Sequence, residues 1–208
     1  MKKILIGIVC TMLLGTVGVA AAPSIHGSTG MITTPSADVL QKGDFSIGYY
    51  KLEDARVGTF NMNIVKNVEI GVSNFNYDQR DNETYFSAKW ALLPETVVTP
   101  GLAIGVEDIG DEDERSAYVV ASKALPFGFR IHGGIGDGRY EKGFVALEKT
   151  INPLSIVGDN NTFPATTLIA EYDGDNFNYG ARLSLVSGLK IDAGVRDHDF
   201  YFGASFTY

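Results

Sequence analysis

Phe200-Tyr201-Phe202-Gly203-Ala204-Ser205-Phe206-Thr207-Tyr208 closes the chain with a strict alternation of apolar residues and polar or small residues. Successive side chains of a β-strand point to opposite faces, so the apolar residues would share one face and the remaining residues the other. A lipid-facing side opposite a polar lumen side is what a strand of a transmembrane β-barrel requires. The edge strand of a soluble β-sandwich stays open as an alternative, because alternation alone does not identify the solvent.

The same ending resembles the C-terminal targeting signal of bacterial outer-membrane proteins. That signal has a polar residue, a glycine two positions later, and two terminal aromatic residues with one residue between them. The matching positions here are Tyr201, Gly203, Phe206 and Tyr208. The resemblance implies a bacterial outer-membrane location and the outer-membrane assembly machinery as a partner.

The first 22 residues have the order of a secretory signal peptide. Lys2 and Lys3 precede an apolar stretch over 4–19, which the small residues Ala20-Ala21-Ala22 follow. Cleavage after Ala21 fits best, and cleavage one residue later is the alternative. The predicted organisation is therefore a signal peptide (1–21), a lead segment (22–42) and a barrel (43–208). We expect the lead to remain loosely docked in the periplasm, with a plug folded into the lumen as the alternative.

Composition narrows the class further. The formal charge is −8, and it falls to −10 once the two lysines of the signal are removed. An acidic exported protein is a poor candidate for binding nucleic acid. The 24 glycines, 10 tyrosines and 12 phenylalanines favour an all-β protein. The only cysteine, Cys10, leaves with the signal, so no disulfide framework is expected.

About twelve segments have the length of a tilted barrel strand and are separated by turn residues. We predict a single antiparallel transmembrane β-barrel of about twelve strands, with ten or fourteen as alternatives. The segments lie near 43–51, 56–66, 68–77, 83–93, 100–108, 115–125, 127–136, 141–150, 165–173, 177–186, 188–196 and 199–208.

The connections between these segments differ in composition. Every odd-numbered connection is acidic, as in Glu53-Asp54-Ala55 and Asp173-Gly174-Asp175, whereas several even ones are tight turns such as 66–67 and 187–188. Barrels of this kind have short periplasmic turns and longer external loops. The acidic connections are therefore predicted to form the outer rim.

The same parity assigns a set of charged residues to the lumen. Both signs are mixed in that set, which favours a salt-bridged interior, and a conducting pore is the alternative. The predicted lumen-lining residues are Glu69, Lys89, Glu107, Lys123, Arg130, His132, Glu148, Glu171, Arg182, Lys190 and Asp192.

Two stretches carry a resemblance to a known family. The first begins with Ser28-Thr29-Gly30-Met31-Ile32-Thr33-Thr34-Pro35-Ser36-Ala37 and leads into the Phe45-Ser46-Ile47-Gly48-Tyr49 strand. The second is Ala170-Glu171-Tyr172-Asp173-Gly174. Both resemble the YjbH-like outer-membrane proteins, a family associated with exopolysaccharide and capsule production. The resemblance implies an outer-membrane β-barrel and offers no catalytic residues.

Candidate sites for catalysis or metal binding are weak. His26-Gly27-Ser28 resembles the His-x-Ser of lipid A deacylases but precedes the first strand, and Asp197-His198-Asp199 fits a solvated turn. An enzyme would need a serine or carboxylate paired with His132 on a neighbouring strand. The acidic residues over 108–114 lack the spacing of a Ca²⁺ loop. No catalytic residue, metal site or cofactor is therefore predicted.

The sequence thus predicts a non-enzymatic envelope or surface component, with a link to exopolysaccharide production or export implied by the resemblance. A small porin-like channel for ions or saccharides is the second hypothesis, and an outer-membrane lipid hydrolase is the third. The expected partners are outer-membrane lipid and lipopolysaccharide, the assembly machinery, and polysaccharide or its export proteins, without nucleic acid.

Overall fold

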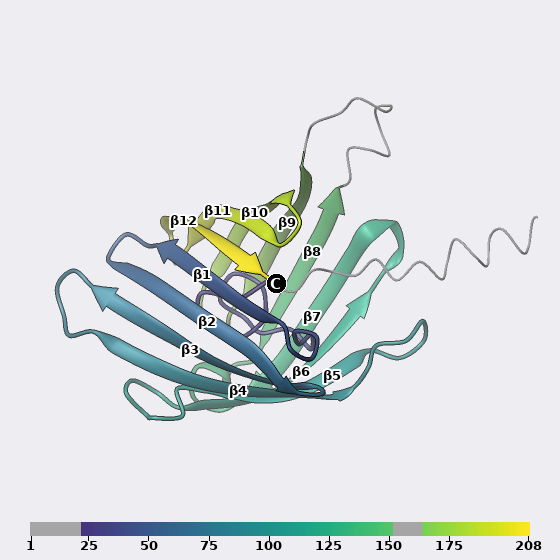
Figure 1. Cartoon of the computed structure of the whole chain (residues 1–208), viewed down its shortest axis with the longest axis horizontal. Coiled ribbons are helices and arrows are strands. Elements are labelled where there is room, and N and C mark those ends of the chain that lie inside the picture. Colours follow the sequence, from purple (N-terminus) through teal and green to yellow (C-terminus); the bar gives the residue numbers. More distant parts are fainter. Residues whose placement is uncertain (1–21, 152–163) are drawn as a thin grey trace, which may run out of the picture.

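The computed structural model describes residues 22–151 and 164–208, which form a closed antiparallel barrel of twelve strands (Figure 1). The strands are β1 (Phe45–Lys51), β2 (Ala55–Val65), β3 (Val68–Tyr77), β4 (Glu83–Leu93), β5 (Gly101–Glu107), β6 (Ser116–Ala124), β7 (Phe129–Gly136), β8 (Phe144–Ile151), β9 (Ala165–Tyr172), β10 (Phe177–Val186), β11 (Leu189–Arg196) and β12 (Asp199–Thr207). Two short 3₁₀ turns, η1 (Pro126–Gly128) and η2 (Gly138–Tyr140), lie in the connections. The all-β class and the strand number predicted from the sequence are confirmed. Among the described residues, no helix is long and apolar enough to cross a membrane.

Each strand pairs with its sequence neighbours, and β1 pairs with β12 to close the ring. The closing register runs from Ser46 opposite Thr207 to Lys51 opposite Phe202. Closure leaves no unpaired strand edge, so the backbone N–H and C=O groups along the seam find partners. The predicted signal peptide, residues 1–21, lies outside the described residues.

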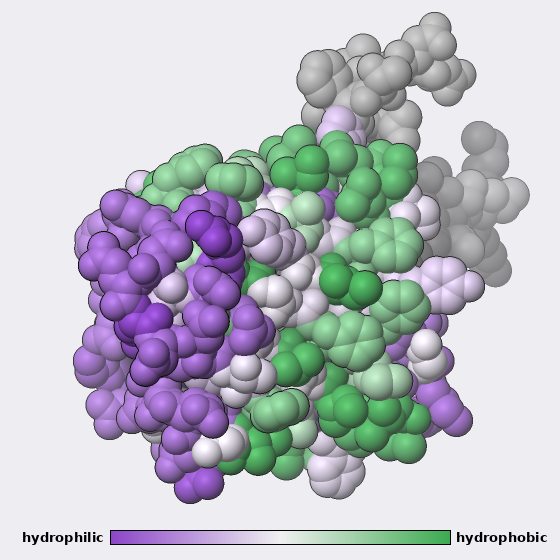
Figure 2. All heavy atoms as spheres, turned by 60° about the vertical axis from the view of Figure 1, so that its left-hand side comes forward, coloured by the Kyte–Doolittle hydropathy of each residue, from purple (hydrophilic) through white to green (hydrophobic). Residues whose placement is uncertain are grey.

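Side chains alternate between the inner and outer surfaces of the barrel. In β2, Val57, Thr59 and Asn61 are buried, whereas Phe60 and Met62 between and beyond them are exposed. Figure 2 shows the result on one face of the molecule, where apolar side chains cover the barrel wall and hydrophilic residues gather at one rim. The sequence periodicity of two therefore separates an apolar exterior from a largely polar interior.

The last strand follows the predicted alternation. Phe202, Phe206 and Tyr208 are exposed on the outer wall, whereas Tyr201 faces inward and is buried. Gly203 also faces inward, where an added Cβ would collide with the ring of Tyr50 on β1. A glycine is therefore needed at this position for β12 to approach β1 at the seam.

The two rims differ in charge. Antiparallel alternation puts six connections, over 52–54, 78–82, 108–115, 137–143, 173–176 and 197–198, at one end of the barrel. Five of these six carry two or more Asp or Glu residues, and the sixth carries Asp197. We call this end the acidic rim. The tight turns at 66–67 and 187–188 lie at the opposite end, together with the C-terminus.

The lead segment differs from the expectation of a loose periplasmic arm. Most of residues 22–40 are buried, and they coil inside the ring of strands (Figure 1). The physical reason lies in the barrel wall, which supplies charged and hydroxyl groups for the polar backbone of this segment. We call residues 22–40 the plug.

Candidate functional site

The plug has a compact fold of its own. Isolated bridges pair Pro23 with Thr29 and Gly30 with Pro35, and the amide of Ile25 donates to the carbonyl of Ile32 at 2.9 Å. Gly30 sits where the plug chain turns back on itself, since an added Cβ would collide with the carbonyl oxygen of Thr34. Local hydrogen bonds thus fix the shape of the plug, and contacts with the wall fix its position.

Glu69 on β3 is the first of these wall contacts. Its carboxylate accepts hydrogen bonds from the Thr29 amide at 2.8 Å, the Thr29 hydroxyl at 2.6 Å and the Leu40 amide at 3.0 Å. Lys89, its neighbour on β4, lies 3.6 Å from the carboxylate and donates to the Thr29 carbonyl at 2.7 Å. Both side chains are about 2% exposed, so this pair is held inside the barrel by the plug backbone.

Glu171 on β9 binds residues 32–34 of the plug. It accepts from the amides of Ile32, Thr33 and Thr34 at 3.1, 2.8 and 3.3 Å. The hydroxyls of the two threonines donate to it as well, at 2.6 and 2.8 Å, and so does the Asn178 side chain at 3.0 Å. A buried carboxylate is stable only when it is well hydrogen-bonded, and consecutive backbone amides provide that environment here.

Arg182 on β10 provides the complementary charge. Its Nε donates to Asp192 on β11 at 2.6 Å, and its terminal nitrogens donate to the carbonyls of Gly30 and Met31 at 3.2 and 3.1 Å. The carbonyl oxygens of Gly30 and Met31 thus face a guanidinium group, while the amides of residues 32–34 face the carboxylate of Glu171. The wall therefore places a positive group against plug carbonyls and a negative group against plug amides.

Arg139 and Glu107 hold the plug near the acidic rim. Arg139, from η2, donates to the Thr33 carbonyl at 2.6 Å and lies 3.5 Å from Glu107. Glu107 also accepts from the Ser28 hydroxyl at 2.7 Å and from Tyr140 at 2.8 Å. These contacts connect the plug to the β5 end and to the β7–β8 connection at once.

The last residues of the plug are attached to β7. Arg130 pairs with Asp38 and also donates to Glu95 at 2.8 Å. Burial by itself would raise the pKa of Asp38, but the hydrogen bonds and positive charge of Arg130 outweigh that effect and hold the pKa below its usual value. Asp38 is therefore ionised at neutral pH.

A buried serine, histidine and glutamate line up across three neighbouring strands. Ser122 Oγ on β6 lies 2.8 Å from His132 Nδ1 on β7, and Glu148 on β8 lies 3.6 Å from His132 Nε2. This meets the sequence condition stated for a hydrolase, a serine beside His132. The Ser122 hydroxyl, however, also accepts the Ala37 amide at 2.8 Å, so in this structure the serine anchors the plug.

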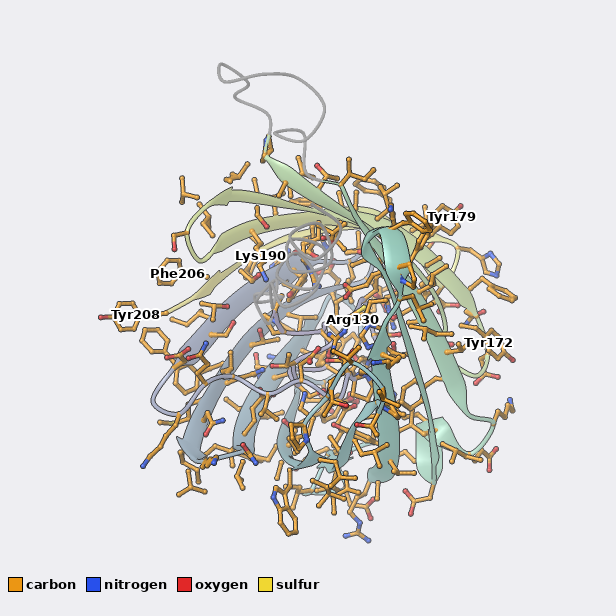
Figure 3. All side chains as sticks on the ribbon, turned by 90° about the vertical axis from the view of Figure 1, so that its right-hand side faces the viewer. Arg130, Tyr172, Tyr179, Lys190, Phe206 and Tyr208 are labelled. Atoms are coloured by element: carbon orange, nitrogen blue, oxygen red, sulfur yellow. The ribbon has the colours of Figure 1, made fainter. Side chains whose placement is uncertain are left out.

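Ten of the eleven predicted lumen-lining residues face the lumen and are buried. Figure 3 shows Arg130 and Lys190 within the barrel, and Tyr172, Tyr179, Phe206 and Tyr208 on its outside. The ten are Glu69, Lys89, Glu107, Arg130, His132, Glu148, Glu171, Arg182, Lys190 and Asp192.

Lys123 is the exception, and its assignment to the lumen is wrong. The inward residues of β6 include Tyr118, Val120 and Ser122, so Lys123 has the outward parity. Its position near the end of the strand explains why a charge is tolerated there. The ammonium group donates to the Val97 carbonyl at 2.9 Å and lies 3.6 Å from Glu95.

The remaining sequence candidates lie apart from one another. His26 belongs to the plug, where its ring packs 5.3 Å from Phe75, and burial followed by the charges of Arg139 and Arg196 lowers its pKa well below the usual value. His198 lies in the turn of the acidic rim between β11 and β12, with φ of 70°. Within 22–151 and 164–208, no group of three or more Asp, Glu, His or Cys side chains is arranged to hold a metal ion.

The sequence reasoning missed the plug-binding residues of the lead itself, such as Thr29 and Thr33, and the inward aromatic residues Tyr50 and Tyr118. The aromatic residues were detectable, since each occupies an inward position of an alternating strand. The lead threonines gave no periodic signal, because their partners are carboxylates 40 to 138 residues away in the chain.

Comparisons with known proteins agree with this architecture. The KdgM porin is similar in structure, with a TM-score of 0.53 over 79% of this chain and 98% of the porin. Its sequence identity is 8%, so this similarity concerns the fold alone. "Uncharacterized lipoprotein YjbH" of Escherichia coli (strain K12) is 28% identical over 135 residues, or 58% of this chain. Those residues make up 19% of the E. coli protein, so the chain spans about a fifth of this curated relative.

A family model matches about two thirds of the chain. The YjbH model, described as "Exopolysaccharide biosynthesis protein YbjH", matches residues 23–162, which include the plug from Pro23 onward and β1 through β8. Together with the porin-like barrel, the match indicates a protein of the cell envelope. The chain belongs to the YjbH family.

Proposed function

We propose that this protein is a closed outer-membrane β-barrel that acts without catalysis as an envelope component of exopolysaccharide production or export. The observation that carries the proposal is the plug, which occupies the lumen and is bonded to the charged wall on several sides. An interior organised in this way supports a structural barrel over an open pore.

The apolar outer wall supports a membrane location. Phe86, Trp90, Phe202 and Leu147 are all exposed on the outside of the barrel, each at 41% or more. Strands can cross a membrane only in a closed barrel, because each unpaired backbone group in hydrocarbon costs several kcal/mol. Outer-membrane lipid, lipopolysaccharide and the assembly machinery are the partners that this location implies.

We infer the absence of catalysis from the burial and hydrogen bonding of Ser122, the residue best placed to act as a nucleophile. Ser122 and His132 are only 1% and 0% exposed, and the serine oxygen accepts a hydrogen bond from the Ala37 amide of the plug. A substrate would have to displace the plug before it could reach this serine. A role in holding the plug accounts for the same contacts.

A gated channel is the second candidate, because the wall behind the plug carries charges of both signs that would line an aqueous passage. Glu69, Glu171 and Arg182 would face water if the plug were withdrawn. This candidate differs from the first in one measurable property, which is ion conduction through the folded protein.

Planar-bilayer recordings of the refolded mature protein test the proposal. We expect no discrete conductance steps from the full mature chain, whose folding is checked by heat-modifiable migration in gels. Steps in the full-length protein would refute a closed barrel. Steps that arise only after deletion of 23–40 would support the gated channel.

The envelope role needs a cellular test. A host strain that lacks the chromosomal copy should produce less exopolysaccharide, and the wild-type gene should restore the output. Unchanged output, measured as secreted polysaccharide per cell, would contradict the proposed role. The Ser122→Ala variant also loses the hydrogen bond from the Ala37 amide, so resistance of 22–40 to proteolysis is checked first. With the plug still docked, the variant should restore the output fully, since no catalytic step is proposed, and failure to do so would support the hydrolase.

A further inference from the structure

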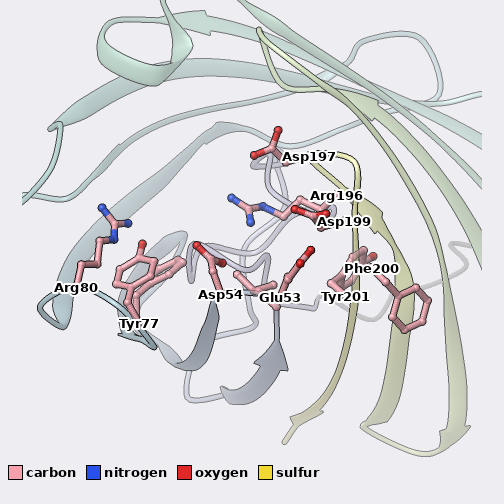
Figure 4. A pocket seen from close by; sticks show the side chains of 11 residues that line it. Glu53, Asp54, Tyr77, Arg80, Arg196, Asp197, Asp199, Phe200 and Tyr201 are labelled. Atoms are coloured by element: carbon pink, nitrogen blue, oxygen red, sulfur yellow. The ribbon is translucent and has the colours of Figure 1, made fainter.

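A cavity of about 260 Å³ opens at the acidic rim, beside the plug (Figure 4). It lies over the turn between β1 and β2, with the end of β3 on one side and the turn between β11 and β12 on the other. We call it the rim pocket. Its volume is just below the range of roughly 300–1,000 Å³ that is typical of small-molecule sites, so it would hold a small group or the end of a longer chain.

The walls of the rim pocket contain both hydrogen-bond acceptors and donors. Four carboxylates line it, Glu53, Asp54, Asp197 and Asp199, together with the guanidinium groups of Arg80 and Arg196. Ionised carboxylates only accept hydrogen bonds, and guanidinium groups only donate them. A ligand that satisfies this lining must carry several hydrogen-bond donors and several acceptors, and hydroxyl groups supply both.

Aromatic residues support the pocket from behind its polar lining. Phe75 and Tyr201 are among the lining residues but are each only 2% exposed, and the Arg80 guanidinium covers the Tyr77 ring at 3.5 Å from its centroid, so the surface open to a ligand is mainly polar. Arg80 is also held by Glu83 at 3.3 Å. Both contacts favour one orientation of the Arg80 side chain, which reduces the entropy lost on binding.

These features together fit a sugar residue. A pyranose ring presents hydroxyl groups around its edge, each able to donate and to accept, which suits the mainly polar lining of carboxylates and guanidinium groups. A hydrocarbon ligand would leave the charged groups desolvated without partners, at a cost in free energy. The geometry fits a small, hydroxyl-rich ligand.

Charge decides which sugars are admitted. Four carboxylates and two guanidinium groups leave an excess of negative charge, and the neighbouring connections of the acidic rim add to it. The Glu53 carboxyl contacts Asp199, and this contact raises the pKa of Glu53. A uronate or phosphorylated sugar would be repelled, whereas a neutral sugar would not, and an amino sugar would be attracted.

We propose that the rim pocket binds a neutral or amine-bearing sugar residue of a polysaccharide at the mouth of the barrel. The inference rests on the proposed function for the source of the saccharide, while the binding itself requires neither a membrane nor an open lumen. The site would hold a polysaccharide at the mouth and would not conduct it through the barrel.

Calorimetric titration of the full mature protein, folded in detergent, tests this directly. The probes are cello-oligosaccharides, chitosan oligomers and oligogalacturonates, which present neutral, amine-bearing and acidic sugars. We expect the first two to bind and the third not to bind. Added salt should weaken binding of the chitosan oligomers more than binding of the neutral probe, because only the former is attracted by charge.

The double variant Glu53→Gln/Asp199→Asn should weaken binding of chitosan oligomers at least tenfold. A matched control, Asp111→Asn/Glu112→Gln, removes two charges from the same rim outside the pocket and should change the affinity less than twofold. Equal losses in both variants would show that only the bulk charge matters and would overturn the site. Absence of binding by all three probes, or preferential binding of oligogalacturonate, would also overturn it.

Failure here is distinguishable from failure of the proposed function. Loss of exopolysaccharide in the deletion strain, with no saccharide binding by the folded protein, would leave the envelope role intact and remove the rim pocket from it. Saccharide binding by the protein without any change of exopolysaccharide output in the deletion strain would refute the envelope role and leave the rim pocket as a saccharide site.

Discussion

Replacement of Glu171 by Gln should release the plug without unfolding the barrel. Glu171 accepts six hydrogen bonds from described residues, five of which come from the plug. The amide of Gln keeps one acceptor oxygen, but its NH₂ group would face donors in place of the second oxygen. At least two plug groups would then lose their acceptor while they remain buried.

The magnitude follows from those contacts. Each buried group left without a partner costs about 1–3 kcal/mol, so two of them give roughly 2–6 kcal/mol. Removal of the buried negative charge offsets part of this, because an ionised carboxylate is itself expensive to desolvate. A net loss of about 3 kcal/mol corresponds to a change of roughly 100-fold in the equilibrium between docked and released plug.

Hydrogen exchange of the backbone amides measures that equilibrium. In the variant, amides 30–34 should exchange roughly 100-fold faster, while amides in β2, β3 and β10 keep their protection, since local opening and global unfolding are separate events. The matched control is Glu148→Gln, which makes the same chemical change on β8 at a side chain whose ion-pair partner is His132 and not the plug. Unchanged exchange at 30–34 in folded Glu171→Gln, or equal acceleration in the control, would refute the reasoning.

Three further predictions concern the plug and the seam. Gly30→Ala puts a Cβ against a carbonyl oxygen four residues later, so proteolysis within 22–40 should become faster while the barrel keeps its heat-modifiable migration; undiminished resistance would contradict the need for glycine. Arg130 lowers the pKa of Asp38, so their ion pair stabilises the docked plug fully at pH values above 3.8, the ordinary pKa of Asp. This stabilisation disappears as the pH falls through the lower pKa of the folded state. Hydrogen exchange near residue 38 should therefore accelerate only below pH 3.8, and Asp38→Asn should abolish that pH dependence. Gly203→Val should lower the midpoint of thermal unfolding, because its side chain meets the Tyr50 ring at the seam, whereas an equally stable variant would show that the seam adapts.

The barrel was predictable because its determinants are local. A strand in a barrel wall alternates between two environments, and that alternation is visible in a window of ten residues. The same rule fails where both faces are apolar or small. In β6, Ala117, Val119 and Ala121 face outward and Tyr118 and Val120 inward, so hydrophobicity does not reveal the parity. Lys123 was misassigned for this reason.

The plug could not be predicted in the same way, because nothing in its own composition requires burial. Its residues are mainly small, hydroxylated or glycine, and they form no regular strand or helix to carry a periodic signal. Their burial depends on charges that the barrel brings together only after closure. A lead of this kind is favourable inside the lumen only when each of its backbone groups meets a partner there.

The two stretches that resemble the YjbH-like proteins contact each other in the folded protein. The first stretch forms most of the plug, and the second contains Glu171, which binds the Thr33 and Thr34 amides and hydroxyls of the first. The two motifs lie 138 residues apart in sequence at the Thr33 contact, yet each satisfies the polar groups of the other. Backbone amides and a carboxylate that are buried together would each be costly alone, so a change in either stretch leaves the other destabilised. What the two patterns specify together is therefore a plug and its receptor on the wall, and the barrel is the scaffold that brings them into contact.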